Sequence, residues 1–543
     1  MSISDSTATQ KKASSPVSAS WITRSVLSNW FGLAANLVIS FFMAPFIVHK
    51  LGNSSYGLWA LMLQLTGYMG VVDVGLRSAL VRFVSRLRAQ NDQDGLNELM
   101  SSTLQLYSSF AMLCLLGGSF LAFFALPHLH VPPALLLQAR NTLLIASVIL
   151  ASDFVFATFQ GSLAGLSRWD LRNLISTGVL ILRAGLTFAM LSRGHGLVTL
   201  ALVQLFASLI GHVFEVYFVR RLLPGLRFSW GHLQKKVLRP IFSHSAYSML
   251  IGLGVGINYE VDSIVIAAFL PVQEITFYVI GFNLIKYLRD LINASSMIVA
   301  PLASHLDAQG RSHGVSQLLK RGSKYTLLLS YLGCAGLLCL GPDFIRLWMG
   351  DDYAARSGKV VIILTLGLFF SLTENIGGHL LFGLGKHRLN VWCTLGEAAL
   401  NLAASIFLVR HYGIYGVAAG TGLAALVVRG WFFPNAALKV FQVRWKEYLA
   451  ASVLPTIVPT LAFAGGIMTT RHFIPVHGYG TLFLAAMGGV ITYLPFLYTV
   501  GLDAGERAQL RSRLKEFLST RLRLGVVPGV ASPDWNRKTD KGL

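Results

Sequence analysis

The sequence predicts an all-α integral membrane protein with about 14 transmembrane helices, built as two parallel six-helix lobes plus a C-terminal helix pair. Of its 543 residues, 54% are hydrophobic and only 13% are charged, against roughly 25% charged residues in an ordinary soluble domain. Apolar runs long enough to cross a bilayer recur along the chain. Short motifs also recur between the two halves of the sequence at a nearly constant spacing.

Each apolar run has about 20 residues or more, the length that a helix needs to cross roughly 30 Å of hydrocarbon. In chain order the predicted spans are residues 22–48, 56–75, 100–125, 139–160, 173–192, 197–219, 241–268, 272–300, 325–345, 359–382, 391–410, 414–433, 448–470 and 480–500. The segments between the spans are too short for a soluble domain. Any chemistry is therefore expected within the helical bundle or at its rims.

The two halves are predicted to have the same orientation because of an internal repeat. GLSR at 165–168 leads to Asn173, and GLGK at 383–386 leads to Asn390, at an offset of 218 residues. A weaker match relates the loops that end at Tyr56 and Tyr278 at a similar offset. This pattern predicts a parallel repeat about an axis along the membrane normal, as in transporters that rock two halves around a central site.

The repeat defines the expected domains. These are an N-lobe at 22–219 (helices 1–6), a C-lobe at 241–433 (helices 7–12) and an additional helix pair (helices 13–14) at 448–500. The segment at 503–524, with leucines on one face and arginines elsewhere, is expected to be an amphipathic cytoplasmic helix on the inner leaflet. Residues 1–21 and 525–543 are expected to be disordered at the cytoplasmic N-terminus and in the tail.

The Lys and Arg distribution predicts the topology. With the N-terminus inside, 33 of the 45 cations fall in inner segments and only 8 in outer loops, which is the bias of a positive-inside protein. Both termini are therefore expected to be cytoplasmic. The net charge of +21 is an orientation signal, and no nucleic-acid partner is expected.

Other functional classes have no support in the sequence. No apolar region with a cleavage site follows the polar start, so no cleaved signal peptide is expected. Neither a Walker sequence nor an HExxH motif is present, and no paired-cysteine pattern suggests a metal. The four cysteines fall in apolar runs and are expected to be core residues. We expect no catalytic residues, no metal and no cofactor.

The most informative polar residues lie in the run that Pro271 and Pro301 bracket. Lys286 sits near its midpoint, and the residues that share its helical spacing are Asn283, Arg289, Asp290 and Asn293. An unpaired charge at the bilayer midplane costs several kcal/mol unless it faces water or a partner. This helix is therefore predicted to line a polar cavity.

The segment LGNSSYGLWALMLQLTGYMGVVDVGLRSALVRFVS (51–85) resembles the polysaccharide transporter family, the O-antigen and exopolysaccharide flippases of the multidrug/oligosaccharidyl-lipid/polysaccharide exporter superfamily. Four further segments support this resemblance, namely GLSRWDLRN (165–173), YEVDSIVIAAFL (259–270), FIRLWMGDDYA (344–354) and HYGIYGVAAGTGLA (411–424). The resemblance covers nearly the whole chain. It implies a fourteen-span fold that moves a lipid-linked oligosaccharide from the inner to the outer leaflet.

A polyprenyl-pyrophosphate-linked oligosaccharide carries an anionic head group, so its carrier needs cations and hydrogen-bond donors in the membrane. Lys286, Arg289, Arg183 and Asn283 are the candidate head-group residues. The alternative is that Lys286 pairs with Asp290 one turn on, and that Arg183 pairs with a carboxylate elsewhere in the bundle.

Four carboxylates have two open interpretations. Asp153, Glu374, Glu397 and Asp290 either carry a coupling proton or act as counter-ions to the buried cations. His379 is expected to be a packed polar residue.

Four other ionisable residues are expected to have structural roles. Arg429 and Glu215 are expected to extend to the inner interface without a function. Asp73 is expected to shape lobe closure or a helix end. Asp262 is expected near the outer end of its span, either at an outer gate or simply exposed and ionised.

The leading hypothesis is an inner-membrane flippase for an undecaprenyl-pyrophosphate-linked oligosaccharide in surface or exopolysaccharide biosynthesis, working by alternating access. The lipid tail would lie along the additional pair at 448–500. Expected partners are this substrate, membrane lipids and the polymerase and glycosyltransferases of the same pathway. The alternatives are a cation-coupled drug exporter of the same superfamily, disfavoured by the span count and by Lys286 and Arg289, and a membrane glycosyltransferase or polymerase, disfavoured by the short outer loops.

Overall fold

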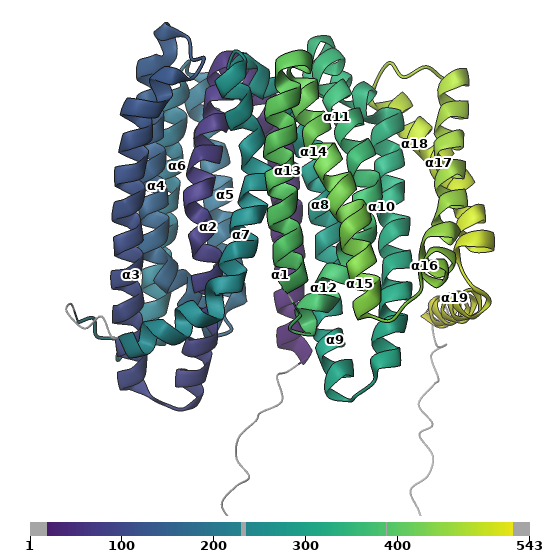
Figure 1. Ribbon diagram of the computed structural model, residues 1–543, viewed down its shortest axis with the longest axis horizontal. Helices are drawn as coiled ribbons and strands as arrows, with labels where there is room; N and C mark the ends of the chain where they lie inside the picture. The colour runs from purple at the N-terminus through teal and green to yellow at the C-terminus, as the bar shows by residue number, and fades with distance from the viewer. Residues whose placement is uncertain (1–18, 230–234, 387, 525–543) are drawn as a thin grey trace, which may run out of the picture.

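The computed structural model describes residues 19–229, 235–386 and 388–524, and every regular element within these ranges is a helix. The long helices run roughly parallel and stand side by side (Figure 1). The helices of the first half are α1 (Ala19–Leu51), α2 (Asn53–Ala89), α3 (Gln93–Phe120), α4 (Pro133–Gly165), α5 (Trp169–Ser192) and α6 (Leu197–Leu222). We call α1–α6 the N-half.

The second half contains more elements because several of its helices are broken. They are α7 (Lys235–Phe269), α8 (Gln273–Ser296), α9 (Val299–Ala308), α10 (Ser312–Met349), α11 (Asp351–Ser371), α12 (Asn375–Gly383), α13 (Arg388–Tyr412), α14 (Ile414–Ala425) and α15 (Phe433–Val440). We call α7–α15 the C-half. The chain ends with α16 (Trp445–Tyr448), α17 (Leu454–Phe473), α18 (Tyr479–Phe496) and α19 (Ala504–Leu524).

Short π-helical and 3₁₀ turns continue several of these helices. The π-helical turns are Leu121–Ala125, Leu426–Phe432, Leu449–Val453 and Leu497–Gly501, and the 3₁₀ turns are Leu126–His128 and Leu372–Glu374. A π-helical turn adds a residue to the helix and often marks a functional site. The turn at Leu426–Phe432 carries Arg429, which lines the main cavity described below.

The chain is a multi-pass integral membrane protein. Within the described ranges, eleven helices are long and apolar enough to cross a membrane, and a twelfth is counted if the bent pair Leu250–Asn258 and Glu260–Phe269 forms one span. Two further long helices, α2 with 37 residues and α8 with 24, are not among them. In α8 the reason is its composition, because Lys286, Arg289 and Asp290 fall within little more than one turn.

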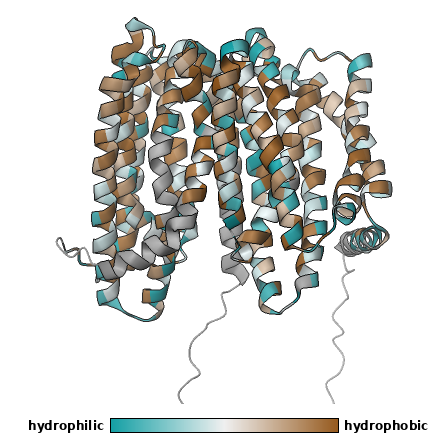
Figure 2. Cartoon of the chain, in the orientation of Figure 1, coloured by the Kyte–Doolittle hydropathy of each residue, from teal (hydrophilic) through white to brown (hydrophobic). Residues whose placement is uncertain are grey.

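The outward faces of the helices are apolar, whereas the hydrophilic residues gather at the helix ends and inside the bundle (Figure 2). Large side chains are left uncovered on these faces, including Trp392 at 72% and Phe473 at 77% exposure. Such faces would be unfavourable in water, but they match the hydrocarbon of a bilayer. The basic helix α19 is seen end-on and so runs across the direction of the spans (Figure 1).

Three helices make the main contact between the two halves, α2 on one side and α7 and α8 on the other. The N-half helix α2 packs along α7 and α8, and α7 also packs along α13. The two predicted lobes are therefore not separate bodies in this conformation. Their boundaries, 22–219 and 241–433, stay a prediction.

The halves are closed against each other at the end that the charge distribution predicts to be external. There Thr276 donates a 2.6 Å hydrogen bond to the Asn53 carbonyl, and Tyr353 bonds the Asn53 side chain. The Trp348 indole donates to the Phe41 carbonyl at 2.8 Å, and the two rings stack. Residues of both halves contribute to one buried apolar cluster at this end.

The opposite end lacks such a shared cluster within the described residues. The apolar cluster that includes Leu80 and Leu163 draws only on the N-half. The cluster that includes Ala303 and Phe433 draws on the C-half and the segment just after it. The halves are therefore joined at the predicted external end and have separate cores at the predicted cytoplasmic end.

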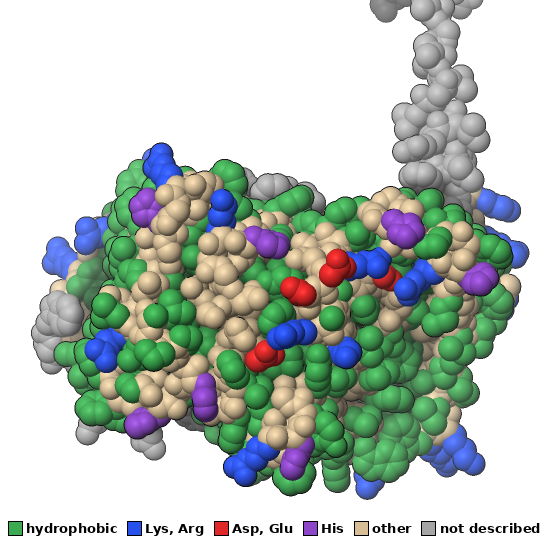
Figure 3. All heavy atoms as spheres, turned by 90° about the horizontal axis from the view of Figure 1, so that it is seen from above, with side chains coloured by type: hydrophobic (Ala, Val, Ile, Leu, Met, Phe, Trp, Pro, Cys, Tyr) green, Lys and Arg blue, Asp and Glu red, His purple; other side chains and the backbone are tan. Residues whose placement is uncertain are grey.

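The predicted external face carries paired charges. Asp343 lies 2.7 Å from Arg471, and Glu274 lies 2.8 Å from Arg356. Figure 3 shows carboxylates beside Lys and Arg side chains on this face. Surface pairs of this kind contribute little to stability.

Some sequence-based boundaries differ from the structure. The α8 helix ends at Ser296, and Pro301 lies inside the separate helix α9. The predicted span 359–382 is broken by a 3₁₀ turn at Leu372–Glu374. α1 begins at Ala19, inside the segment expected to be disordered, whereas residues 1–18 and the predicted tail at 525–543 lie outside the described residues. The segment predicted to be helical at 503–524 forms α19, while its amphipathic character and its place on the inner leaflet stay predictions.

Candidate functional site

The main cavity has a volume of about 1200 Å³ and lies among α2, α7, α8, α12 and α13. Its charged lining residues are Glu260, Lys286, Arg289, Asp290, Glu374, Glu397 and Arg429. The C-half supplies all of them. From the N-half, α2 contributes aromatic and amide side chains, including Trp59 and Gln64.

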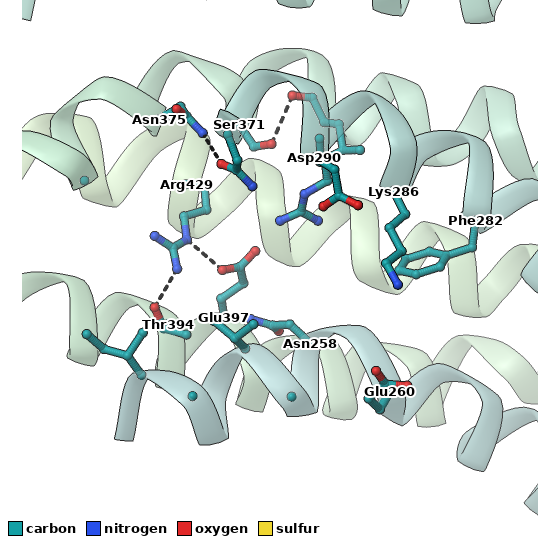
Figure 4. Close-up of a pocket in the computed structure, with 18 of the residues that line it drawn as sticks. Asn258, Glu260, Phe282, Lys286, Asp290, Ser371, Asn375, Thr394, Glu397 and Arg429 are labelled. Carbon is teal, nitrogen blue, oxygen red and sulfur yellow. Dashed lines mark hydrogen bonds and ion pairs between the residues drawn. The ribbon is translucent and has the colours of Figure 1, made fainter. Parts of the chain in front are cut away.

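The polar stripe predicted on α8 faces this cavity. Asn283, Lys286, Arg289, Asp290 and Asn293 all line it, because residues three or four apart lie on one face of a helix. The prediction that this helix lines a polar cavity is therefore confirmed. Figure 4 shows Lys286 and Asp290 on the same side of the cavity.

Lys286 is the most accessible cation of the stripe. Its side chain is exposed to the cavity, and it makes no hydrogen bond or ion pair with another described residue. Glu260 and Asp290 interact with it only electrostatically. The expected direct pair between Lys286 and Asp290 is therefore not formed in this conformation.

Arg429 sits opposite α8 at the centre of a dense polar network. Its Nε donates to Glu397 at 2.7 Å, and one terminal nitrogen lies 3.3 Å from Glu374. Asn390 and Thr394 accept two more hydrogen bonds, at 2.9 and 2.6 Å. The guanidinium is only 13% exposed, so the expectation that Arg429 extends to the interface is wrong.

Glu374 and Glu397 thus have Arg429 as their direct partner, which is a different cation from those the sequence suggested. Arg289 interacts electrostatically with Glu374 but does not replace Arg429. The counter-ion interpretation of these two carboxylates has geometric support, whereas a coupling role stays a prediction. Glu374 reaches the cavity from the 3₁₀ break between α11 and α12.

Arg183 occupies a second cavity of about 570 Å³, formed by α1, α4, α5 and α6 within the N-half. Its terminal nitrogen donates to Gln204 at 2.9 Å. The structure therefore separates Arg183 from Lys286 and Arg289, which share the main cavity. No carboxylate within the described residues forms an ion pair with Arg183.

Asp153 also lines this second cavity, where it meets a histidine that the sequence did not single out. His212 Nε2 lies 3.1 Å from Asp153, and Nδ1 lies 3.1 Å from Glu215. Glu215 is only 7% exposed. The expectation that Glu215 extends to the inner interface is therefore wrong, because it is held inside by His212.

Asp262 forms a third polar group, between α7, α8, α13 and α14. It accepts hydrogen bonds from Tyr278, from Thr421 at 2.9 Å and from Asn401 at 3.4 Å. Its exposure is 1%, so the expectation of an exposed, ionised Asp262 is wrong. This network ties the helices of the C-half together.

Two other expectations concern single residues. His379 lines the main cavity as a half-buried side chain. Asp73 lies in α2, but its side chain is outside the described part of the chain. Within that part, no group of His, Cys, Asp and Glu side chains could hold a metal ion, and the four cysteines are free.

Sequence reasoning did not single out His212 on α6, and it assigned no function to Arg429 in the π-helical turn Leu426–Phe432. A usable signal was present, because these residues are 217 positions apart, nearly the offset of 218 found between the repeated loops. Equivalent positions in the two halves that both carry a basic side chain within an apolar helix point to a candidate functional position in each half.

Comparison with known proteins places these features in context. The family described as "Polysaccharide biosynthesis protein" matches residues 22–306, which is more than half of the chain. The protein named "Uncharacterized membrane protein EpsK" of Bacillus subtilis (strain 168) is 23% identical over 501 residues, covering 90% of this chain and 97% of its own length. The "Putative O-antigen transporter" of Shigella flexneri is 22% identical over 413 residues, covering 73% and 93%.

Solved structures share the fold. The lipid II flippase MurJ in an inward closed conformation superposes with a TM-score of 0.69 at 16% identity, over 88% of this chain and 98% of its own length. At this identity the similarity shows a common fold only. The all-helical fold predicted from the sequence is therefore confirmed, and its exact span count is not.

Proposed function

We propose that this chain, which belongs to the polysaccharide biosynthesis protein family, translocates an undecaprenyl-pyrophosphate-linked oligosaccharide from the inner to the outer leaflet. The family assignment agrees with the resemblance found in the sequence. The relative from Shigella flexneri carries the name of an O-antigen transporter, and the fold is that of a flippase. These similarities support a transporter rather than an enzyme.

The observation that carries the proposal is Lys286. Its ammonium group extends into a cavity of about 1200 Å³ from the middle of α8 and has no direct ion-pair partner among the described residues. A cation at the depth of a membrane without a salt bridge is costly unless a ligand or water supplies the missing interactions. A pyrophosphate supplies oxygens for such a charge. Arg289 and Asn283 line the same cavity and would add contacts.

A second set of groups in the cavity fits the sugar. Four buried oxygens that line it have no hydrogen-bond partner in the described part of the chain, namely those of Gln64, Asn258, Glu374 and Asn375. Buried acceptors normally find a donor. Sugar hydroxyls are donors of the right kind, so these oxygens would receive the glycan while Lys286 receives the phosphate.

The joined and separate ends of the two halves support alternating access. The halves share a core at the predicted external end and have separate cores at the other end. We assign this conformation to the stage before release, with the head group entering from the cytoplasm. Breaking the contacts of Asn53 and Trp348 would then open the external side.

The proposal also specifies the membrane arrangement. Counting α2 and α8 as polar, cavity-lining spans together with the twelve apolar ones gives the fourteen predicted spans. Both termini would be cytoplasmic, in a bacterial inner membrane. A polymerase and glycosyltransferases of the same pathway would supply and consume the substrate, while α17 and α18 would face its lipid tail.

A drug exporter is the competing function, and one observation favours it. The cavity contains four carboxylates, Glu260, Asp290, Glu374 and Glu397, which could attract a cationic drug. Two of them are already engaged by Arg429. The accessible Lys286 would repel a cation, so the flippase fits better.

The test is a flipping assay in proteoliposomes that contain an undecaprenyl-pyrophosphate-linked oligosaccharide. We expect the wild-type protein to expose the substrate in the outer leaflet. Lys286→Ala should slow this at least about tenfold, because loss of one charge-assisted contact of about 1.5–3 kcal/mol is worth that much. Lys439→Ala removes an exposed lysine and is the matched control.

A Lys286→Ala protein that flips at the wild-type rate would refute the head-group assignment. Export of a cationic dye by the wild-type protein, with no flipping of the lipid-linked substrate, would favour the drug exporter instead.

A further inference from the structure

The cavity of the N-half contains a histidine held between two carboxylates. His212 lies on α6 with its side chain 4% exposed, and its ring stacks on Phe156 at 4.5 Å. Asp153 approaches Nε2 from α4, and Glu215 approaches Nδ1 from one turn along α6, both at 3.1 Å. The cluster therefore fixes both ring nitrogens opposite anionic oxygens.

This arrangement has a direct consequence for protonation. A neutral imidazole has one N–H and one lone pair, whereas an imidazolium has an N–H on each nitrogen. With a carboxylate oxygen 3.1 Å from both nitrogens, a neutral ring would turn a lone pair toward a carboxylate. With both carboxylates ionised, only the protonated ring satisfies both contacts.

Nε2 is buried, and apart from the Asp153 oxygen at 3.1 Å it has no partner among the described residues. Asp153 itself is 44% exposed, and it lines the cavity. A proton on Nε2 can therefore pass to Asp153 and from there to water in the cavity. The His212 ring holds the proton, and the Asp153 carboxylate connects it to water in the cavity.

We propose that His212, Asp153 and Glu215 form a proton-binding site in the N-half cavity and that proton binding there is coupled to transport. The first part concerns the site alone, while the coupling rests on the flippase function proposed above. No redox step is involved. A proton bound on Nε2 leaves by way of Asp153 and the cavity, and it returns by the same route.

The coupling follows from which helices the site joins. The protonated ring links α4 to α6 through an ion pair with Asp153. Loss of the proton replaces this attraction by repulsion between a lone pair and a carboxylate, which weakens the α4–α6 contact. Proton release therefore favours a conformation in which these helices separate, and a ligand can shift such an equilibrium only through this kind of difference.

The other charged groups in the cavity are on α5. Arg172 and Arg183 line it, and Arg183 is bonded to Gln204. The side chains that α1 contributes, Asn36 among them, are uncharged. The two arginines balance the two carboxylates, so the charged lining sums to zero when His212 is neutral and to one positive charge when His212 is protonated.

The first experiment measures the proton without any substrate. Purified full-length protein labelled with [¹³C]histidine is titrated by NMR, and the resonance missing from His212→Gln identifies His212. We expect this resonance to titrate reversibly between about pH 5 and pH 10, the range in which a perturbed histidine changes charge. A resonance that keeps one protonation state throughout would overturn the proton site.

The second experiment tests coupling in proteoliposomes carrying the undecaprenyl-pyrophosphate-linked oligosaccharide. With one proton per cycle, a gradient of one pH unit shifts the distribution between leaflets by at most about tenfold. We expect the wild-type protein and the exposed control His313→Gln to respond to the gradient. His212→Gln and His212→Arg should flip the substrate without responding, since neither can exchange a proton.

His212→Arg keeps a fixed cation between the two carboxylates. If it flips the substrate without responding to the gradient, misfolding cannot explain the missing response. A full gradient response in His212→Arg would overturn the coupling, as would a wild-type response to a sodium gradient but not to a pH gradient. Absence of any flipping by the folded wild-type protein would instead refute the proposed function, and the NMR titration would still decide the proton site.

Discussion

Each half of the molecule has a basic side chain between two carboxylates at an equivalent position, but the basic residue is a histidine in one half and an arginine in the other. In the N-half, His212 lies between Asp153 and Glu215. In the C-half, Arg429 lies between Glu374 and Glu397. The spacing from His212 to Arg429 is 217 residues, and that from Asp153 to Glu374 is 221.

The difference shows how two repeated positions can have different roles, one as a permanent charge and the other as a charge that changes with pH. An arginine stays charged at any physiological pH and forms several hydrogen bonds at once. It therefore suits a permanent structural centre beside the main cavity. A histidine changes charge near neutral pH, so the same geometry in the N-half becomes sensitive to protons.

The largest expected effect is loss of the fixed cation. Arg429→Ala leaves Glu374 and Glu397 close together without their partner, and breaking a buried pair costs about 3–5 kcal/mol. We expect a large fall in the thermal unfolding temperature of the purified protein in detergent. Combining it with Glu374→Gln and Glu397→Gln should restore much of the loss, because the unpaired charges are then gone.

Arg410→Ala is the control for this comparison, since Arg410 is exposed and lies over the Phe269 ring. If Arg429→Ala unfolds at the same temperature as Arg410→Ala, Arg429 is not the structural centre of the C-half.

A smaller effect is expected at Asp262, which has no acidic counterpart in the N-half. The residue 218 positions earlier is Ala44. Asp262→Asn turns an acceptor into a partial donor that faces the donors Tyr278 and Thr421. Such a buried mismatch costs about 1–3 kcal/mol.

Thermal unfolding measures this cost as well, with the exposed Asp352→Asn as the control. An Asp262→Asn protein as stable as the control would show that the network does not hold the C-half together.

The smallest effect is expected at the junction of α19 with α10, outside both cavities. Burial opposes ionisation of Glu506, but hydrogen bonds from Lys324, Tyr325 and the Asp503 amide outweigh it and hold its pKa below the usual range. The stabilisation is therefore complete above the ordinary pKa of about 4.5 and is lost as the pH falls through the lowered value. Glu506→Gln should weaken the attachment by about 1 kcal/mol at neutral pH.

Spin labels on α10 and α19 would report the attachment as a distance distribution. The matched control is Glu447→Gln. Glu447 pairs with Lys320, another lysine of α10, at 3.8 Å, but its side chain is 51% exposed. Equal distances in Glu506→Gln and wild type from about pH 7 down to pH 3 would contradict the assignment. In the wild-type protein, the α10–α19 distance distribution should broaden only at a pH below the usual carboxylate pKa range. Broadening at such a low pH would distinguish the response of Glu506 from that of His212.

Much of the architecture could be predicted from local patterns. Runs of about 20 apolar residues specify spans, since each must satisfy its own backbone in hydrocarbon. The charged stripe on α8 predicted a lined cavity correctly, because residues on one helical face share one environment. Arg429 and Glu215 were misjudged, since their depth in a span does not show which partner another helix brings to them.

The sequence by itself determined that this chain crosses the membrane repeatedly and that α8 exposes Lys286 to a polar space, while the parallel repeat of its halves stays a prediction. These properties depend on periodicity and composition, which are local. Only the tertiary structure decided that Arg183 and Lys286 lie in different cavities, that Arg429 unites Glu374 and Glu397, and that His212 stands between Asp153 and Glu215. The physical reason is that pairing of buried charges depends on how separate helices pack, and the paired residues are up to 59 positions apart in the chain, from Asp153 to His212.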